Sequence, residues 1–365
     1  MKQTIKTAQI FDRGVLVKNQ TLLIENGLVI GLESHNSASA DVNLITTGFS
    51  DLQVNGGGGV LLNSSPNAEG VMAIVEAHQS LGTNAILPTV ITDMPDVIDL
   101  AADAVIETMG EAGVLGIHIE GPHINVARKG THDPKRIRPF DKDTLATVTK
   151  LRKAGVPVLL TLAPELLCDD DLKTLDEMGV KVFAGHSAAS FDETNHAISN
   201  GLTGFTHLYN AMPQMTSREP GIIASALLSN CYCGIIVDGI HVDYAMLKLA
   251  RAHNPERFFI VSDAMPSVGG PDEFQLFSHH IRVENGRLIN SEGSLAGAHI
   301  DMLSSVRNIV NYCNVDLEKA LQMGTDIPRK VMGYESETLI GQPVNRLLAL
   351  DQNLEIMTPF EIIAH

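Results

Sequence analysis

Short apolar runs alternate along the chain with segments in which apolar residues recur every three or four positions. The runs are nearly continuous in apolar residues, as buried parallel strands are. They comprise a stretch that ends at Leu52–Val54 and residues 85–90, 114–120, 156–163, 181–186, 204–208, 233–239 and 258–264. Helical periodicity lies between them, for example at residues 68–82, 94–110 and 243–254. The pattern therefore predicts eight consecutive βα units.

Eight such units predict an α/β fold built on a closed (β/α)8 barrel of the TIM type. A doubly wound open sheet is the alternative, but eight consecutive units would be unusual for it. After the eighth strand, residues 273–295 predict a strand-rich insertion, and residues 299–333 predict the closing helices.

Both ends of the chain show a different pattern. Residues 5–33 and 346–363 alternate in short β-like runs with turn residues between them. Neither end alone could form a stable sheet, so we expect the two to combine. The predicted organisation is a small β-sandwich domain from residues 1–46 and 335–365, beside a barrel from residues 47–334.

Composition narrows the possible partners. Of 365 residues, 44% are hydrophobic, and 43 acidic against 26 basic residues give a net charge of −17. A nucleic-acid or anionic-membrane binder needs a basic face, so neither partner is expected.

Four scattered cysteines are too few for a disulfide framework. No apolar run approaches the length of a membrane span, and the N-terminus lacks a signal-peptide core. We therefore expect a soluble, cytoplasmic protein.

Polar residues that can carry chemistry follow the predicted strands. They are Gln53, Asn55, Glu120, His186, His207, His241 and Asp263. In a parallel barrel the carboxyl ends of the strands share one rim, which holds the active site. The sequence therefore predicts that these side chains converge on one pocket.

Glu120, His186 and His207 offer one carboxylate oxygen and two imidazole nitrogens. This donor set suits one catalytic divalent ion per chain, with a further position open for water. Zn²⁺ is the first choice, with Fe²⁺, Co²⁺ and Mn²⁺ as alternatives. Asp263 is then the natural general base, which accepts a proton from water and returns it to a leaving group.

Several longer motifs resemble those of the N-acetylglucosamine-6-phosphate deacetylases of the amidohydrolase superfamily. They are GFSDLQVNGGGGV (48–60), HIEGPHI (118–124), KGTHDP (129–134), AGHSAA (184–189), THLYNAMPQMTSREPG (206–221), DGIHVD (238–243), VSDA (261–264) and LAGAHIDM (295–302). The resemblance implies an amidohydrolase-type barrel that hydrolyses acetate from an amino-sugar phosphate. It also implies the metal ligands and the acid/base group named above.

The same resemblance implies the substrate contacts. His132 would contact the acetyl carbonyl, and a histidine there can donate to the developing oxyanion. The sugar-phosphate and closing contacts would be Thr131, Asn210, Ala211, Arg218, Asp238, Gly239, Ile240, His241, Leu295, Ala296 and Gly297. Arg218 has the rigid fork that suits a phosphate. The resemblance further implies a homodimer in which Arg218 reaches the neighbouring subunit's pocket.

The chain also departs from common amidohydrolase patterns. Gln53 and Asn55 stand where many of these enzymes carry His-x-His, and the fourth strand end, TLAPE, has no lysine to bridge two metals. Both departures favour one tightly bound metal, with Gln53 near a water or at a weak or indirect metal contact. Ala298 and His299 stand where relatives commonly place a serine pair, and the C-terminal tail is short for the family.

The expected reaction is deacetylation of N-acetylglucosamine 6-phosphate to glucosamine 6-phosphate and acetate. N-acetylgalactosamine 6-phosphate is the nearest alternative substrate. A cyclic-amide hydrolase would need the missing His-x-His and lysine. A non-catalytic sugar-phosphate sensor would be expected to have lost Asp263 or a ligand, and all of them are present.

Overall fold

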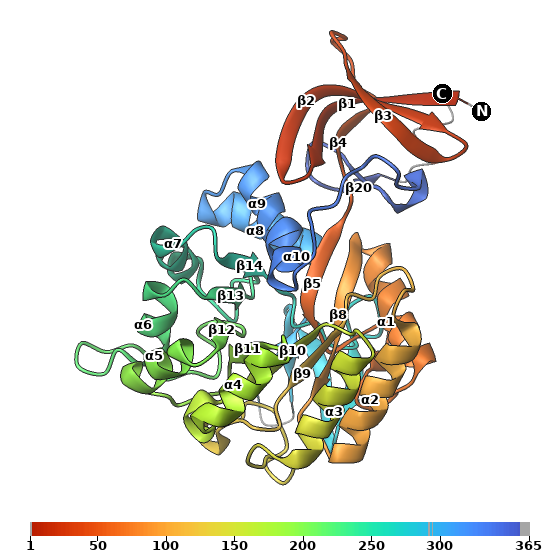
Figure 1. Ribbon diagram of the computed structural model, residues 1–365. Helices are drawn as coiled ribbons and strands as arrows, with labels where there is room; N and C mark the ends of the chain where they lie inside the picture. Colours follow the sequence, from red (N-terminus) through yellow and green to blue (C-terminus); the bar gives the residue numbers. More distant parts are fainter. Residues whose placement is uncertain (1, 291–292, 294, 358–365) are drawn as a thin grey trace.

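The computed structural model describes residues 2–290, 293 and 295–357. Its centre is a parallel sheet of eight strands that curves into a barrel, in the order β14-β13-β12-β11-β10-β9-β8-β5 (Figure 1). These strands are β5 (Phe49–Val54), β8 (Thr83–Ile91), β9 (Ile117–Glu120), β10 (Val158–Leu162), β11 (Lys181–Ala184), β12 (Leu202–Phe205), β13 (Tyr232–Ile235) and β14 (Phe258–Ile260). A parallel bridge between Val54 and Ala264 brings the two edges of the sheet together. The predicted barrel is confirmed.

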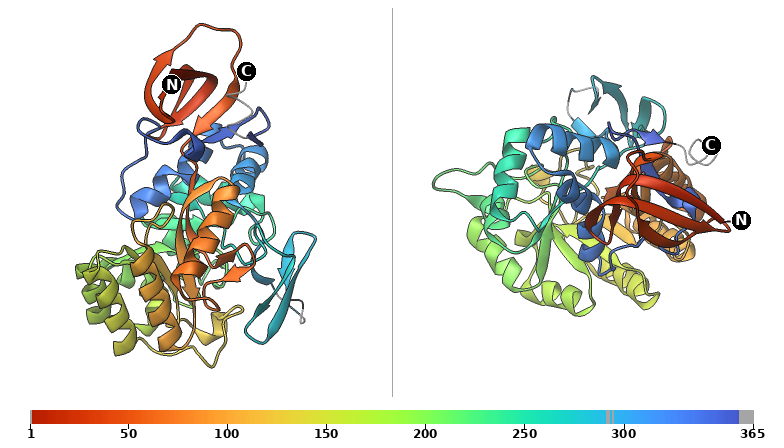
Figure 2. Two further views of the ribbon diagram at one scale, coloured as in Figure 1. Left: turned by 90° about the vertical axis from the view of Figure 1, so that its right-hand side faces the viewer. Right: turned by 90° about the horizontal axis from the view of Figure 1, so that it is seen from above.

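Helices follow the barrel strands and surround them (Figure 2). They are α1 (Ala68–Ser80), α2 (Pro95–Thr108), α3 (Lys142–Lys153), α4 (Asp169–Glu177), α5 (Phe191–Ser199), α6 (Gly221–Leu228) and α7 (Tyr244–His253), then α8 (Met302–Cys313), α9 (Leu317–Gly324) and α10 (Asp326–Val331). Side-chain caps start several of them, as Asn67 does for α1 and Asp301 for α8. Short 3-10 turns are η1 (Val126–Arg128), η2 (Pro164–Leu166) and η3 (Val344–Arg346).

The barrel core is continuous from the strand interior to the helix layer. Every residue of β5, β9 and β10 is buried, which explains why these strands are apolar runs without alternation. The largest fully buried side chains include Phe49, Phe183, Phe205, Phe258 and Phe259.

No described helix has both the length and the apolar character that crossing a membrane would require. All four cysteines are unpaired.

A second sheet combines both ends of the chain, in the order β20-β19-β4-β1-β2-β3. Its strands are β1 (Lys2–Asp12), β2 (Val15–Glu25), β3 (Leu28–Ser34), β4 (Val42–Thr46), β19 (Leu348–Leu350) and β20 (Ile356–Met357). It has an apolar core of its own, which includes Ile10, Leu22 and Leu339. β5 begins three residues after β4 ends, so this sheet lies at the end where barrel strands begin. Residues 358–363 of the predicted C-terminal run lie outside the described residues.

The predicted insertion is an antiparallel sheet beside the barrel (Figure 2). It contains β15 (Glu273–Leu276), β16 (His279–Glu284), β17 (Arg287–Ile289) and β18 (Leu295–Ala298). A further two-stranded ribbon, β6 (Gly56–Gly57) with β7 (Val60–Leu61), follows β5. Ala298 N donates to the carbonyl of Asp263 at 3.1 Å, so β18 is fastened to the segment that follows β14.

Candidate active site

A cavity of about 180 Å³ opens at the carboxyl ends of the barrel strands. Its lining comes from the ends of many strands, and it comprises Asn55, Ile91, Glu120, Gly130, Thr131, His132, His186, His207, Asn210, Ala211, His241, Asp263, Met265, Leu295 and Gly297. Glu120 is the last residue of β9, whereas His186 and His207 each lie two residues beyond their strands. The structure therefore brings the sequence-predicted ligands and Asp263 to one place.

The three predicted metal ligands meet through their donor atoms. Glu120 Oε1 lies 3.1 Å from His186 Nε2 and 2.9 Å from His207 Nε2. The two Nε2 atoms are 3.0 Å apart, and all three side chains are buried. Burial alone would raise the pKa of Glu120, but the two imidazoles outweigh it and hold that pKa well below its ordinary value.

The surroundings of the two histidines indicate that this cluster fits a cation. His186 Nδ1 donates to the carbonyl of Arg128 at 2.8 Å, so a neutral ring directs the Nε2 lone pair at the Glu120 carboxylate. His207 Nδ1 is buried and has no hydrogen-bond partner among the described residues. A buried carboxylate on which two imidazole nitrogens converge is a donor set for a divalent ion.

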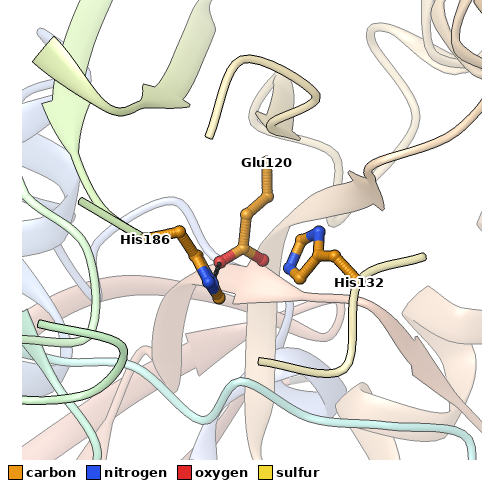
Figure 3. Close-up of side chains that lie close together, drawn as sticks. All are labelled: Glu120, His132 and His186. Atoms are coloured by element: carbon orange, nitrogen blue, oxygen red, sulfur yellow. Dashed lines mark hydrogen bonds and ion pairs between the residues drawn. The ribbon is translucent and has the colours of Figure 1, made fainter. Parts of the chain in front are cut away.

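His132 lies against the same carboxylate (Figure 3). Glu120, His132 and His186 have ligand atoms that all lie within 4.8 Å of one another. His132 Nδ1 is 2.7 Å from Thr92 Oγ1, and its ring centroid is 4.4 Å from that of His186. Burial lowers the pKa of His132 to about 3, so this imidazole is neutral.

Two amides of β5 and its end hold the carboxylates in place. Gln53 Nε2 donates to Glu120 at 3.2 Å and to Asp263 Oδ1 at 3.1 Å, and Asn55 Nδ2 donates to Asp263 Oδ1 at 2.7 Å. Gln53 thus bridges the ligand carboxylate and the predicted base. Asn55 was predicted to reach the pocket, but its contact with Asp263 was not predicted.

Asp263 is surrounded by groups that adjust its acidity. Burial and the nearby charge of Glu120 raise the pKa of Asp263 to about 6, against the opposing effects of His207 and Asn55. A carboxyl group of this kind can both accept and return a proton near neutral pH.

Three of these side chains sit on strained backbone. His186, His207 and Asp263 have φ angles of 49°, 33° and 52°, in the left-handed region. Such conformations cost roughly 1–3 kcal/mol each in non-glycine residues, and they cluster at functional sites. The turn out of the strand aims each side chain into the cavity.

The predicted substrate contacts divide into three groups. Thr131, Asn210, Ala211, His241, Leu295 and Gly297 line the cavity. Asp238 does not, but its Oδ2 accepts from His241 Nδ1 at 2.6 Å and its Oδ1 accepts from the backbone N–H groups of Ile240 and His241. Burial would raise the pKa of Asp238, but His241 lowers it below the ordinary value. Gly239 lies in this turn with a φ of 70°.

Two predicted contacts lie away from the cavity. Ala296 is buried in the small core of the insertion, with Leu61 and Leu288, so its methyl group packs rather than binds. Arg218 is exposed on the loop between β12 and α6, which projects from the side of the barrel (Figure 1), and it makes no ion pair with any described residue.

The comparisons with known proteins agree on one family. The chain is 40% identical to an N-acetylgalactosamine-6-phosphate deacetylase of Shewanella sp. over 335 residues, which is 88% of this chain and 84% of the relative. It is 32% identical to an N-acetylglucosamine-6-phosphate deacetylase of Haemophilus influenzae over 330 residues, 87% of this chain and 83% of the relative.

A solved structure shares the whole fold. It is a mutant N-acetyl-D-glucosamine-6-phosphate deacetylase of Mycobacterium smegmatis in complex with N-acetyl-D-glucosamine 6-phosphate. Its TM-score is 0.87 at 25% identity, with 98% of each chain covered. No protein-family model matches the chain.

Proposed function

Because the chain belongs to the family of N-acetylglucosamine-6-phosphate and N-acetylgalactosamine-6-phosphate deacetylases, we propose that it hydrolyses the acetamide bond of N-acetylglucosamine 6-phosphate. The products are glucosamine 6-phosphate and acetate, so the enzyme is a hydrolase acting on a linear amide. The observation that carries the proposal is the convergence of Glu120, His186, His207 and Asp263 on one buried cavity at the barrel rim.

Glu120, His186 and His207 would hold one divalent cation, with Zn²⁺ as the first choice and Fe²⁺, Co²⁺ or Mn²⁺ as alternatives. A cation bound there polarises the substrate carbonyl and lowers the pKa of water. The resident donors support this assignment, because all three side chains are buried and their donor atoms lie within 3.1 Å of one another.

The chain's own residues provide the remaining chemistry. Asp263 accepts the proton of the attacking water and returns it to the departing sugar amine. Gln53 and Asn55 fix the Asp263 carboxylate beside Glu120. His132 lies 2.7 Å from Thr92 Oγ1 through Nδ1, and a proton carried at its Nε2 would be donated to the developing oxyanion.

The phosphate is bound at the other side of the cavity in this proposal. The Asn210–Ala211 backbone and His241 face it, and the Asp238 carboxylate holds the His241 ring through Nδ1. Arg218 lies outside its own chain's cavity lining, which supports its supply in trans by the second subunit of a homodimer. Four unpaired cysteines suit a reducing compartment, and we place the enzyme in the cytoplasm.

The second candidate substrate is N-acetylgalactosamine 6-phosphate, and the 40% identical relative favours it. The test is acetate release by the pure enzyme from each 6-phosphorylated epimer. A higher kcat/KM for the gluco epimer supports the proposal. A higher kcat/KM for the galacto epimer would make N-acetylgalactosamine 6-phosphate the assigned substrate. Release of acetate from neither would reject a deacetylase.

We expect elemental analysis to find about one transition metal per chain, because the donor atoms of Glu120, His186 and His207 converge on one point at the rim. Chelation should abolish activity without unfolding the barrel, because the metal lies at the rim and not in the apolar core.

His186→Asn should lose the metal, whereas His132→Asn should keep it and lose turnover. A tightly held stoichiometry of two, or loss of metal from His132→Asn, would contradict this assignment.

A further inference from the structure

Glu165 stands at the carboxyl end of β10, where other amidohydrolases can carry a metal-bridging lysine. It belongs to η2 and does not line the cavity. Its carboxylate accepts three hydrogen bonds: from Ser187 Oγ and Ala188 N, each at 2.7 Å, and from Asn125 Nδ2 at 3.0 Å. These donors follow β11 and β9, so one carboxylate connects the ends of three neighbouring strands.

Both segments that donate to Glu165, Ser187–Ala188 and the segment at Asn125, contact or adjoin His186. Ser187 is the next residue in the chain, and it is completely buried. On the other side, Asn125 N donates to the carbonyl of His186 at 2.9 Å. The Asn125 side chain also accepts from Ala127 N at 2.9 Å and so caps η1, whose Arg128 carbonyl accepts from His186 Nδ1 at 2.8 Å.

His186 therefore receives contacts from this network at both its backbone and its ring. Its φ of 49° is a strained conformation that the surroundings must maintain. Its ring direction depends on the Arg128 carbonyl, because a ligand histidine is oriented by the partner of its other nitrogen.

We propose that Glu165 is a positioning residue that holds His186 in its left-handed turn and the 125–132 segment against it, so that Nε2 of His186 faces Glu120. The inference rests on the proposed role of His186 as a metal ligand. Glu165 thus serves the proposed metal site indirectly, through hydrogen bonds to the segments that follow β9 and β11.

The three donors explain why a carboxylate is needed. Two oxygens with several lone pairs accept all three bonds at once. The amide of Glu165→Gln keeps only one accepting oxygen and turns an NH2 group toward the remaining donors. Glu165→Ala removes every acceptor and leaves the buried Ser187 hydroxyl to find a new partner.

The test compares the zinc affinity of the wild type, Glu165→Gln and Glu165→Ala by competition with a chelator, together with thermal unfolding of each metal-free protein. Glu177→Ala is the matched control, because Glu177 is an exposed carboxylate at the end of α4. We expect Glu165→Ala to raise the zinc Kd by roughly 10–100-fold, Glu165→Gln by less, and Glu177→Ala not at all. A general loss of stability would lower the metal-free Tm without weakening zinc binding to the folded protein.

Asn125→Ala keeps the inference testable if Glu165→Ala does not fold. This substitution removes the hydrogen bond between Asn125 and Glu165, so it should also raise the zinc Kd. In the double variant Asn125→Ala, Glu165→Gln, the fold increase in Kd should be smaller than the product of the two single fold increases. Tight zinc binding by the wild type with an unchanged Kd in the Glu165 and Asn125 variants overturns the positioning role alone. A wild type that binds no zinc overturns both this role and the proposed metal site.

Discussion

Asp263→Asn is expected to lower kcat by roughly 10²–10⁴-fold or more while the metal stays bound, because the amide cannot accept the proton that general base catalysis transfers. The substitution keeps the shape of the side chain. Asp263 is not among the three predicted ligands, so metal binding by Glu120, His186 and His207 should survive.

The surroundings of Asp263 show why the effect should be large. Gln53 and Asn55 both donate to Oδ1, which leaves Oδ2 as the oxygen that takes the proton. Burial and the charge of Glu120 raise the pKa of this carboxyl to about 6. With a pKa near neutrality the group can accept a proton from water and return it to the departing amine.

The measurement is steady-state acetate release by protein whose metal content has been confirmed by elemental analysis. Asp170→Asn is a matched control, because Asp170 is an exposed carboxylate on α4. Turnover close to that of the wild type in metal-replete Asp263→Asn protein would rule out Asp263 as the base.

The apolar runs predicted the barrel because a strand buried on both faces leaves a nearly continuous apolar stretch in the sequence. They predicted the strand ends less well. The run at residues 181–186 extends two residues past β11, and the run at 258–264 extends four residues past β14. The cause is local: His186 and Asp263 adopt left-handed backbone, so the regular strand pairing ends before it reaches these residues.

The cavity lining was predictable where polar residues follow strand ends, as Glu120 and His207 do. The site was not predictable where a residue acts through a partner distant in sequence. Glu165 is 40 residues from Asn125, and no spacing rule connects them. Ala296 is a different case, because strand alternation directs the side chain of this motif residue into the core of the insertion.

Arg218→Ala should cost roughly 2–5 kcal/mol of transition-state stabilisation with the phosphorylated sugar, as the loss of a charge-assisted contact to phosphate does. The same variant should change little with unphosphorylated N-acetylglucosamine, because that substrate has no phosphate for the guanidinium to bind. The measurement is kcat/KM for both sugars. Binding energy at the phosphate helps to orient the acetamide at the reacting groups, so the loss should appear in kcat/KM and not only in affinity.

Mixing Arg218→Ala subunits with Asp263→Asn subunits tests whether the arginine acts in trans. The exposed position of Arg218 on its projecting loop, outside its own cavity lining, predicts that it does. In the proposed homodimer, each mixed pair of subunits then has one pocket with Asp263 from one chain and Arg218 from the other. An equal mixture with random exchange should regain about a quarter of wild-type activity, because half of the dimers are mixed and each has one complete site. Confirmed subunit exchange without recovered activity would place Arg218 in the site of its own chain, and the loop would then have to fold back over the cavity to reach the phosphate.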